Sequence, residues 1–264
     1  MSPFTVAPND PALVTSDITF PAADGATLMA YVARPRGEGR YPVVLVQHEN
    51  AGTAEHFRDI ARRFAKNGYV ALHLDLLGRF GGTNAIPTNE RGAALSAPGR
   101  AELFVVDWQS AMNYLRRQPY VIDRFGMTGY CFGGGVTWNV AIKDPSLRAA
   151  APFYGRSAYI EETGNVRAAV LGVYAANDMG INSSIDTVRD QLQAARRTYR
   201  INIYPDAPHG FFNDTRPASY VESAATASWR DTLAWFNTYL RAGGFPVTGE
   251  GEAAEEQPVE VAEE

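Results

Sequence analysis

A single cysteine lies in the middle of a short glycine-rich stretch, Gly129-Tyr130-Cys131-Phe132-Gly133-Gly134. Small residues two positions before and after a nucleophile let the backbone turn tightly from a strand into a helix without Cβ clashes, which exposes the nucleophile at the edge of a sheet. The N-terminus of the following helix favours a thiolate. The pattern therefore predicts that Cys131 is a nucleophile. The alternative is a buried cysteine that packs as a small, inert hydrophobe.

Two further polar groups, Asp178 and His209, each follow a predicted strand. In a parallel sheet the carboxyl ends of the strands share one edge, where ligands bind. A histidine takes up and returns a proton near neutral pH, and a carboxylate on its other nitrogen fixes the tautomer. Nucleophile, acid and histidine follow one another in the chain order of the α/β-hydrolases. We therefore expect a Cys131–His209–Asp178 triad, against the alternatives that Asp178 only caps a turn and that His209 is an ordinary loop histidine.

Glu49 follows the apolar run at residues 41–47, which reads as a strand covered on both faces. An α/β-hydrolase places an oxyanion-binding loop at this position, so the backbone N–H groups of Asn50 and Phe132 are the expected donors to a tetrahedral oxyanion. The carboxylate of Glu49 either contacts the Cys131 thiol or only orders its own loop.

Strands and helices alternate along the chain, which predicts an α/β fold with a mostly parallel sheet and helices on both faces, as in the α/β-hydrolase fold. Asp24-Gly25 suits the turn of an antiparallel hairpin at the sheet edge. Residues 80–99, rich in Gly, Pro and Asn, are expected to form a long loop. The predicted strands are residues 17–20, 27–32, 41–47, 69–74, 124–128, 149–155, 168–174 and 199–204, and the predicted helices are 55–67, 101–117, 136–141, 188–197 and 220–240.

Composition divides the 264 residues into three parts: an N-terminal extension at 1–16, a hydrolase domain at 17–243 and an acidic tail at 244–264. The net charge of -5 is concentrated in the tail, where residues 247–264 hold seven glutamates and no lysine or arginine. With few large apolar residues, such a segment does not bury enough surface to offset its ordering entropy. We expect the tail to be disordered, with an acidic interaction tail as the alternative.

Other features limit the partners of the protein. Basic residues are spread over separate helices, unlike a nucleic-acid-binding face. No segment has the ~20 consecutive apolar residues of a membrane span, and the start of the chain does not resemble a signal peptide. One cysteine permits no intrachain disulfide and fits a reducing compartment. We expect a cytoplasmic enzyme, monomeric or a small homo-oligomer, that binds neither nucleic acid nor membrane.

The sequence resembles the dienelactone hydrolases (carboxymethylenebutenolidases) of the α/β-hydrolase superfamily over about residues 17–240. The resemblance implies that Cys131 is the nucleophile, that His209 is base and then acid, and that Asp178 orients His209. It also implies that Glu49 helps to generate the thiolate when substrate arrives, and that no metal or organic cofactor is needed. The motifs that carry it are Gln47-His48-Glu49-Asn50, Gly68-Tyr69-Val70-Ala71, Asp75-Leu76-Leu77-Gly78-Arg79, Gly129-Tyr130-Cys131-Phe132-Gly133-Gly134, Asp178 and His209-Gly210-Phe211.

Two arginines bear on the substrate. By resemblance, Arg79 matches an arginine that binds a substrate carboxylate, a task suited to a bidentate guanidinium. The second arginine of the family, which follows the histidine closely, is replaced here by Arg216 at a different spacing. We expect a small-molecule lactone or ester as substrate. The alternatives are a broad carboxylesterase or thioesterase for uncharged substrates, and a redox-sensing or binding module in which Cys131 is oxidised.

Overall fold

The computed structural model describes residues 2–241, and the acidic segment at 244–264 lies outside them. The strands are β1 (Leu13–Pro21), β2 (Thr27–Pro35), β3 (Tyr41–Gln47), β4 (Val70–Asp75), β5 (Val121–Tyr130), β6 (Leu147–Phe153), β7 (Ala169–Ala175) and β8 (Tyr199–Tyr204). The α-helices are α1 (Glu55–Lys66), α2 (Thr88–Leu95), α3 (Arg100–Arg116), α4 (Phe132–Lys143), α5 (Met179–Asn182), α6 (Ile185–Ala194) and α7 (Glu222–Phe236).

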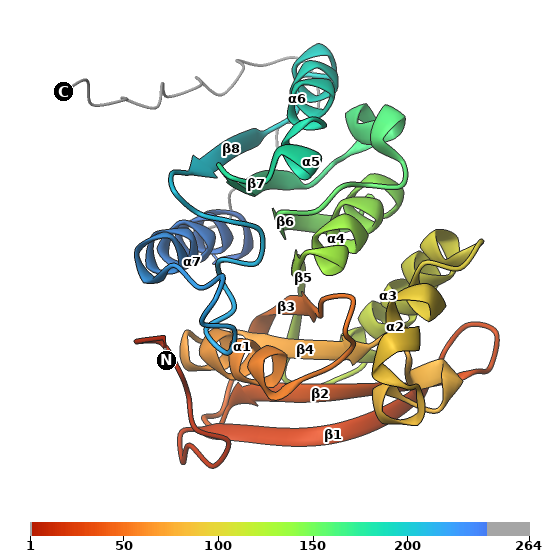
Figure 1. Ribbon diagram of the computed structural model, residues 1–264. Helices are drawn as coiled ribbons and strands as arrows, with labels where there is room; N and C mark the ends of the chain where they lie inside the picture. The colour runs from red at the N-terminus through yellow and green to blue at the C-terminus, as the bar shows by residue number, and fades with distance from the viewer. Residues whose placement is uncertain (1, 242–264) are drawn as a thin grey trace.

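The strands form a single twisted sheet in the order β1-β2-β4-β3-β5-β6-β7-β8 (Figure 1). β2 runs antiparallel to both β1 and β4, and all other neighbours are parallel. The β1–β2 hairpin lies at one edge, and Gly25 at its turn has φ +84°, a conformation that glycine adopts without strain. The predicted sheet and its edge hairpin are confirmed.

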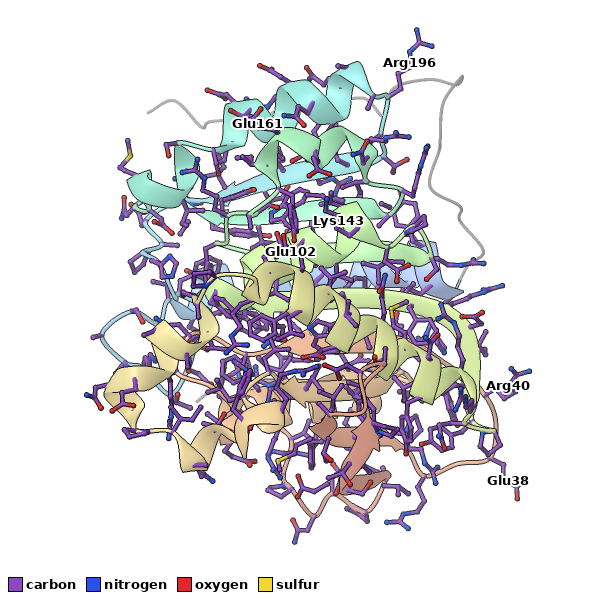
Figure 2. The ribbon with its side chains drawn as sticks, turned by 90° about the vertical axis from the view of Figure 1, so that its right-hand side faces the viewer. Glu38, Arg40, Glu102, Lys143, Glu161 and Arg196 are labelled. Atoms are coloured by element: carbon purple, nitrogen blue, oxygen red, sulfur yellow. The ribbon has the colours of Figure 1, made fainter. Side chains whose placement is uncertain are left out.

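Helices cover both faces of the sheet, as predicted. α1 and α7 lie on one face, and α3, α4 and α6 lie on the other (Figure 1). Figure 2 views the second face, with Glu102 of α3 and Lys143 of α4 on its outer side. β3 shows why its sequence is apolar throughout: Val43 and Leu45 join the core under α3 and α4, whereas alternate residues of the same strand join the core under α1 and α7.

The region at residues 80–99 differs from the expected loop. It contains α2, preceded by two short 3₁₀ helices, η1 (Gly78–Phe80) and η2 (Thr83–Ala85). α2 buries only Leu95, so its sequence lacks the repeated apolar positions that reveal an amphipathic helix. A further 3₁₀ helix, η3 (Ile160–Asn165), precedes β7, and α7 continues as a π-helical turn, η4 (Asn237–Arg241).

Candidate active site

Cys131 lies at the turn between β5 and α4, with φ 57° and ψ -117°. A non-glycine residue rarely adopts this conformation, and such strain is often found at functional sites. Crowding explains the flanking glycines: a Cβ on Gly129 would lie 2.2 Å from the carbonyl oxygen of Gly133, and one on Gly133 would lie 2.5 Å from that of His48. The backbone around Cys131 is therefore packed too tightly for larger residues.

The structure brings His209 and Asp178 together. Nδ1 of His209 lies 2.5 Å from Oδ2 of Asp178, while Oδ1 of the same carboxylate accepts the N–H of Ile181 at 3.4 Å. Asp178 thus caps the short helix α5 and also holds the imidazole. The pKa of His209 is raised to about 9. The interaction with Cys131 is the largest cause and raises the pKa, burial lowers it, and the hydrogen bond with Asp178 raises it further.

Cys131 and His209 open into a cavity of about 410 Å³. Its walls are largely apolar, with side chains contributed by α3, α4 and the segment before α3. The charged residues besides His209 in this lining are two arginines, Arg100 and Arg156, and no carboxylate is among the lining residues. Arg156 is exposed and makes no ion pair within residues 2–241, whereas Arg100 donates to the carbonyl of Ala94 and stacks over Phe80. The cavity therefore favours an anionic ligand.

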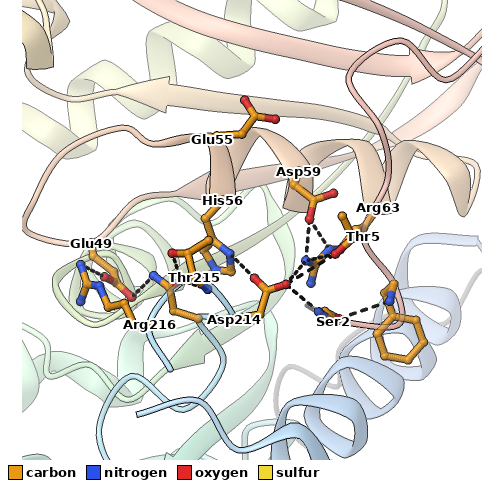
Figure 3. Close-up of polar contacts among 12 residues, drawn as sticks. Ser2, Thr5, Glu49, Glu55, His56, Asp59, Arg63, Asp214, Thr215 and Arg216 are labelled. Carbon is orange, nitrogen blue, oxygen red and sulfur yellow. Dashed lines mark hydrogen bonds and ion pairs between the residues drawn. The ribbon is translucent and has the colours of Figure 1, made fainter. Parts of the chain in front are cut away.

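Glu49 is buried beside this centre, with 1% of its side chain exposed, and faces Arg216 (Figure 3). Nη2 of Arg216 lies 2.7 Å from Oε2 of Glu49, and the amide of Asn213 donates to Oε1 at 3.4 Å. The strand-end loop is fixed by His48, whose Nδ1 is 2.6 Å from the carbonyl oxygen of Glu49 and whose Nε2 accepts the N–H of Leu76. Arg216 thus contacts Glu49 rather than standing free in the cavity.

A second group of buried charges, here called the Asp214 cluster, anchors the loop that carries Asn213 and Arg216. It consists of Asp214, His56, Arg63, Asp59 and Ser2. Asp214 accepts the backbone N–H of Ser2 at 2.7 Å and lies 3.0 Å from Nδ1 of His56 and 3.4 Å from Arg63, which also pairs with Asp59 at 2.5 Å (Figure 3). The cluster joins the N-terminal segment, α1 and the Glu49 contacts.

Arg79 is not brought to the cavity. Its guanidinium forms hydrogen bonds to Asp107, a fully buried residue of α3, and to Asp24 of the β1–β2 turn. The hydrogen bond with Asp107 is the strongest influence and raises the pKa of Arg79 above its usual range, although burial opposes it. Because its N–H groups donate to these two aspartates, the contacts of Arg79 are those of an ion pair that stabilises the fold.

The two expected oxyanion donors differ in position. Phe132 lines the cavity and is the first residue of α4, so its N–H has no partner within that helix. Asn50 is exposed in the turn after β3 and is not among the lining residues. This turn nevertheless approaches α4 closely, because His48 lies against Gly133.

Sequence reasoning missed three residues of this region: Tyr154, Arg100 and Arg156. Each lines the cavity. Tyr154 follows the end of β6, the strand next to the Cys131 strand, and this position at the carboxyl edge of the sheet was a signal that could have identified it. Arg100 begins a helix, so its sequence position carries no comparable signal.

Comparison with known proteins identifies the relatives of this chain. Residues 28–240 match the Dienelactone hydrolase family. The chain belongs to this family. A protein of Escherichia coli K12 named "Putative carboxymethylenebutenolidase" is 35% identical over 245 residues, which cover 87% of this chain and 89% of that protein. A Salmonella typhi protein of the same name is 35% identical over 241 residues, covering 86% of this chain and 88% of the relative.

Solved structures agree with this assignment. The crystal structure of a "Putative Dienelactone Hydrolase" from Klebsiella pneumoniae is 33% identical, with a TM-score of 0.80, and the match covers 86% of this chain and all of that one. The α/β-hydrolase fold and membership of a family of ester-cleaving hydrolases are therefore confirmed. Within the described residues, no helix has the length and apolar character required to cross a membrane.

Proposed function

We propose that the protein opens a lactone or a small ester through a Cys131–His209–Asp178 triad and a covalent acyl-cysteine intermediate. One observation carries the proposal: His209 hydrogen-bonds to Asp178 through Nδ1 and lines, together with Cys131, one cavity on the carboxyl edge of the sheet. The raised pKa of His209 favours an imidazolium beside Cys131, which can give its proton to the leaving oxygen.

In the first step the Cys131 thiolate attacks the carbonyl carbon, and the carbonyl oxygen becomes an oxyanion. Collapse of the tetrahedral intermediate breaks the carbon–oxygen bond, and the proton on His209 passes to the leaving oxygen. His209, now neutral, removes a proton from water, which attacks the thioester and releases the acid. A lactone gives a single hydroxy-acid product, whereas an ester gives an alcohol and an acid.

The N–H groups of Phe132 and Asn50 are proposed as donors to the oxyanion. The proposal is supported by the place of Phe132 as the first residue of α4, where its N–H has no partner within the helix, and by the packing of the turn after β3 against this helix. Glu49 is proposed to assist ionisation of the thiol. If a substrate carboxylate bound Arg216, Glu49 would lose its ion-pair partner. Without this cation the buried carboxylate of Glu49 is able to accept a proton.

The substrate class follows from the charges in the cavity. Arg156 and Arg100 line it, no carboxylate does, and Arg79 is occupied by two aspartates. We therefore propose that a substrate carboxylate meets Arg156 and Arg100, with Arg216 at the Glu49 side, rather than Arg79. An uncharged ester is the second candidate, favoured by the apolar remainder of the wall. The single cysteine supports the cytoplasm as the proposed location.

The decisive test compares wild type with Cys131→Ala on a panel of lactones and aryl esters. Removal of the nucleophile should lower kcat/KM by about 10⁴-fold or more, while thermal unfolding shows an intact fold. Mass spectrometry after brief exposure to substrate should show an acyl adduct on Cys131. A sulfenic acid in place of the adduct would support a redox role instead. Full activity of Cys131→Ala on every cleaved substrate would disprove the mechanism.

A further inference from the structure

Tyr154 occupies a special position beside the proposed nucleophile. It follows the last residue of β6, and the N–H of Cys131 donates to the carbonyl of Phe153 at 3.1 Å. Its ring lies 5.0 Å from the ring of His209, centroid to centroid, and it lines the cavity together with Cys131. The backbone of Tyr154 has φ 35°, in the left-handed region that non-glycine residues rarely adopt. The strained backbone thus places this side chain at the centre of the site.

The hydroxyl of Tyr154 is buried and makes no hydrogen bond of good geometry within residues 2–241. Burial is the main influence that raises the pKa of Tyr154 well above its usual range, and the nearby charges of Glu49 and Cys131 add to this shift. The group therefore keeps its proton and is a donor. A buried donor without an acceptor is unfavourable, so an acceptor that appears during the reaction would be stabilised by it.

We propose that the Tyr154 hydroxyl donates a hydrogen bond to the Cys131 thiolate and thereby stabilises the reactive form of the nucleophile. On ionisation the thiol proton passes to the bases of the proposed mechanism, His209 with the assistance of Glu49, and Tyr154 keeps its own proton throughout. The hydroxyl thus acts as a second donor to the sulfur anion beside the His209 imidazolium and, unlike His209, it does not give up its proton during the reaction. The role of Tyr154 in catalysis rests on the proposed function, whereas its effect on thiol ionisation does not.

The chain is well suited to a direct test because Cys131 is its only cysteine. Alkylation by iodoacetamide forms a carbon–sulfur bond with loss of iodide and proceeds through the thiolate, so its rate against pH reports on this one group. In Tyr154→Phe the midpoint of this profile should rise by about one pH unit. Below the wild-type midpoint kcat/KM should fall about tenfold, and the two enzymes should converge at high pH. An unchanged midpoint would overturn the proposal.

Tyr174→Phe is the matched control. Tyr174 of β7 is also fully buried with an unpartnered hydroxyl, but it does not line the cavity. Its removal should leave both the alkylation profile and the hydrolysis rate unchanged. If Tyr174→Phe shifts the midpoint as much as Tyr154→Phe, the effect comes from loss of any buried hydroxyl and the proposal fails.

Glu49 is the competing acceptor, since its charge contributes to the pKa shift of Tyr154 and its Oε2 is held by an ion pair with Arg216 alone, with no hydrogen bond of good geometry among the described residues. The shift caused by Tyr154→Phe should persist in a Glu49→Gln background, and its disappearance would show that the hydroxyl acts only through Glu49. Should Tyr154→Phe fail to fold, 3-fluorotyrosine at position 154 provides a more acidic hydroxyl and should lower the midpoint; no change there would equally overturn the proposal.

The inference and the proposed function fail in different ways. A shifted alkylation midpoint without any ester or lactone cleavage would support the hydrogen bond and remove the hydrolase mechanism. Hydrolysis that depends on Cys131, together with an unchanged midpoint in Tyr154→Phe, would support the mechanism and remove the hydrogen bond.

Discussion

The Asp214 cluster and the Cys131 site both gather buried polar groups, but they differ in how well those groups are paired. In the cluster each charge faces an opposite charge, and Asp214 also accepts a backbone N–H; Nε2 of His56 is the exception. Around Cys131, Glu49 is ion-paired with Arg216, but the buried Tyr154 hydroxyl lacks a hydrogen bond of good geometry within the described residues. Paired charges hold elements in place, whereas unpaired groups are available to charges that arise during a reaction.

Arg79 resembles the residues of the Asp214 cluster, because its charge is also paired with opposite charges. Its two aspartate partners connect η1 with α3 and with the β1–β2 turn, which are distant in the sequence. Its contacts are therefore those of a residue that stabilises the fold. Charged residues of this protein thus fall into two groups, those that stabilise the fold and those available for chemistry at the Cys131 site.

The largest expected effect lies in the Cys131 site. Asp178→Asn should lower kcat/KM by about 10³-fold, because the amide presents the imidazole in the wrong tautomer. Asparagine still caps α5, so the free energy of unfolding should change little. Since the Asp178 contact helps to raise the pKa of His209 to about 9, NMR titration should show a lower midpoint for His209 in the variant. Asp186→Asn, at an exposed carboxylate, is the control; equal activity of both variants would contradict the triad.

The Asp214 cluster should show the opposite behaviour. Asp214→Ala should lower the free energy of unfolding by about 3 kcal/mol at pH 7, because it removes one of the two carboxylate partners of the buried Arg63 and the only carboxylate partner of His56 within the described residues, together with the acceptor of the Ser2 N–H. Burial raises the pKa of Asp214, but His56, the Ser2 N–H and Arg63 outweigh burial and hold it well below its usual range. A depressed pKa stabilises the fold above about pH 4 and loses this effect as the pH falls through the folded value.

Denaturant titrations at several pH values measure this difference. The gap between wild type and Asp214→Ala should therefore narrow below about pH 4. A gap that is independent of pH, or a variant that loses activity while its stability is unchanged, would show that the cluster serves chemistry rather than the fold.

The smallest effect concerns the two kinds of arginine. Arg156→Gln should raise KM for a carboxylate-bearing ester about tenfold, equivalent to about 1.4 kcal/mol, and leave KM for a neutral ester of matched size unchanged. Arg79→Gln should leave both KM values unchanged and lower the melting temperature, because it breaks a buried ion pair. The reverse pattern would return the substrate-binding role to Arg79.

Local patterns predicted most of the fold. Continuous apolar runs identified strands such as β3 and β7, and Asp24-Gly25 identified the hairpin turn, because each signal lies within a few neighbouring residues. α2 escaped prediction because it buries almost nothing. The order of Cys131, Asp178 and His209 after predicted strands was enough to place them at one edge, because parallel strands end together.

The partners of long side chains could not be predicted from local sequence patterns. Arg79 depends on Asp107, 28 positions later on a helix whose other buried residues are mostly apolar, and Arg216 depends on Glu49 across the sheet edge. These pairings arise from tertiary packing, which no local pattern encodes. Tyr154 lay in a predicted strand, and only the three-dimensional arrangement shows that it lines the same cavity as Cys131 and lies beside the ring of His209.

The left-handed backbone at Cys131 limits which residues can replace it. Threonine offers a hydroxyl of useful reactivity, yet its branched Cβ is poorly tolerated at a positive φ. Serine has no such branch and fits the same turn. An oxygen nucleophile at this position is therefore expected to be serine. Backbone conformation, as well as reactivity, limits which nucleophiles can evolve at position 131.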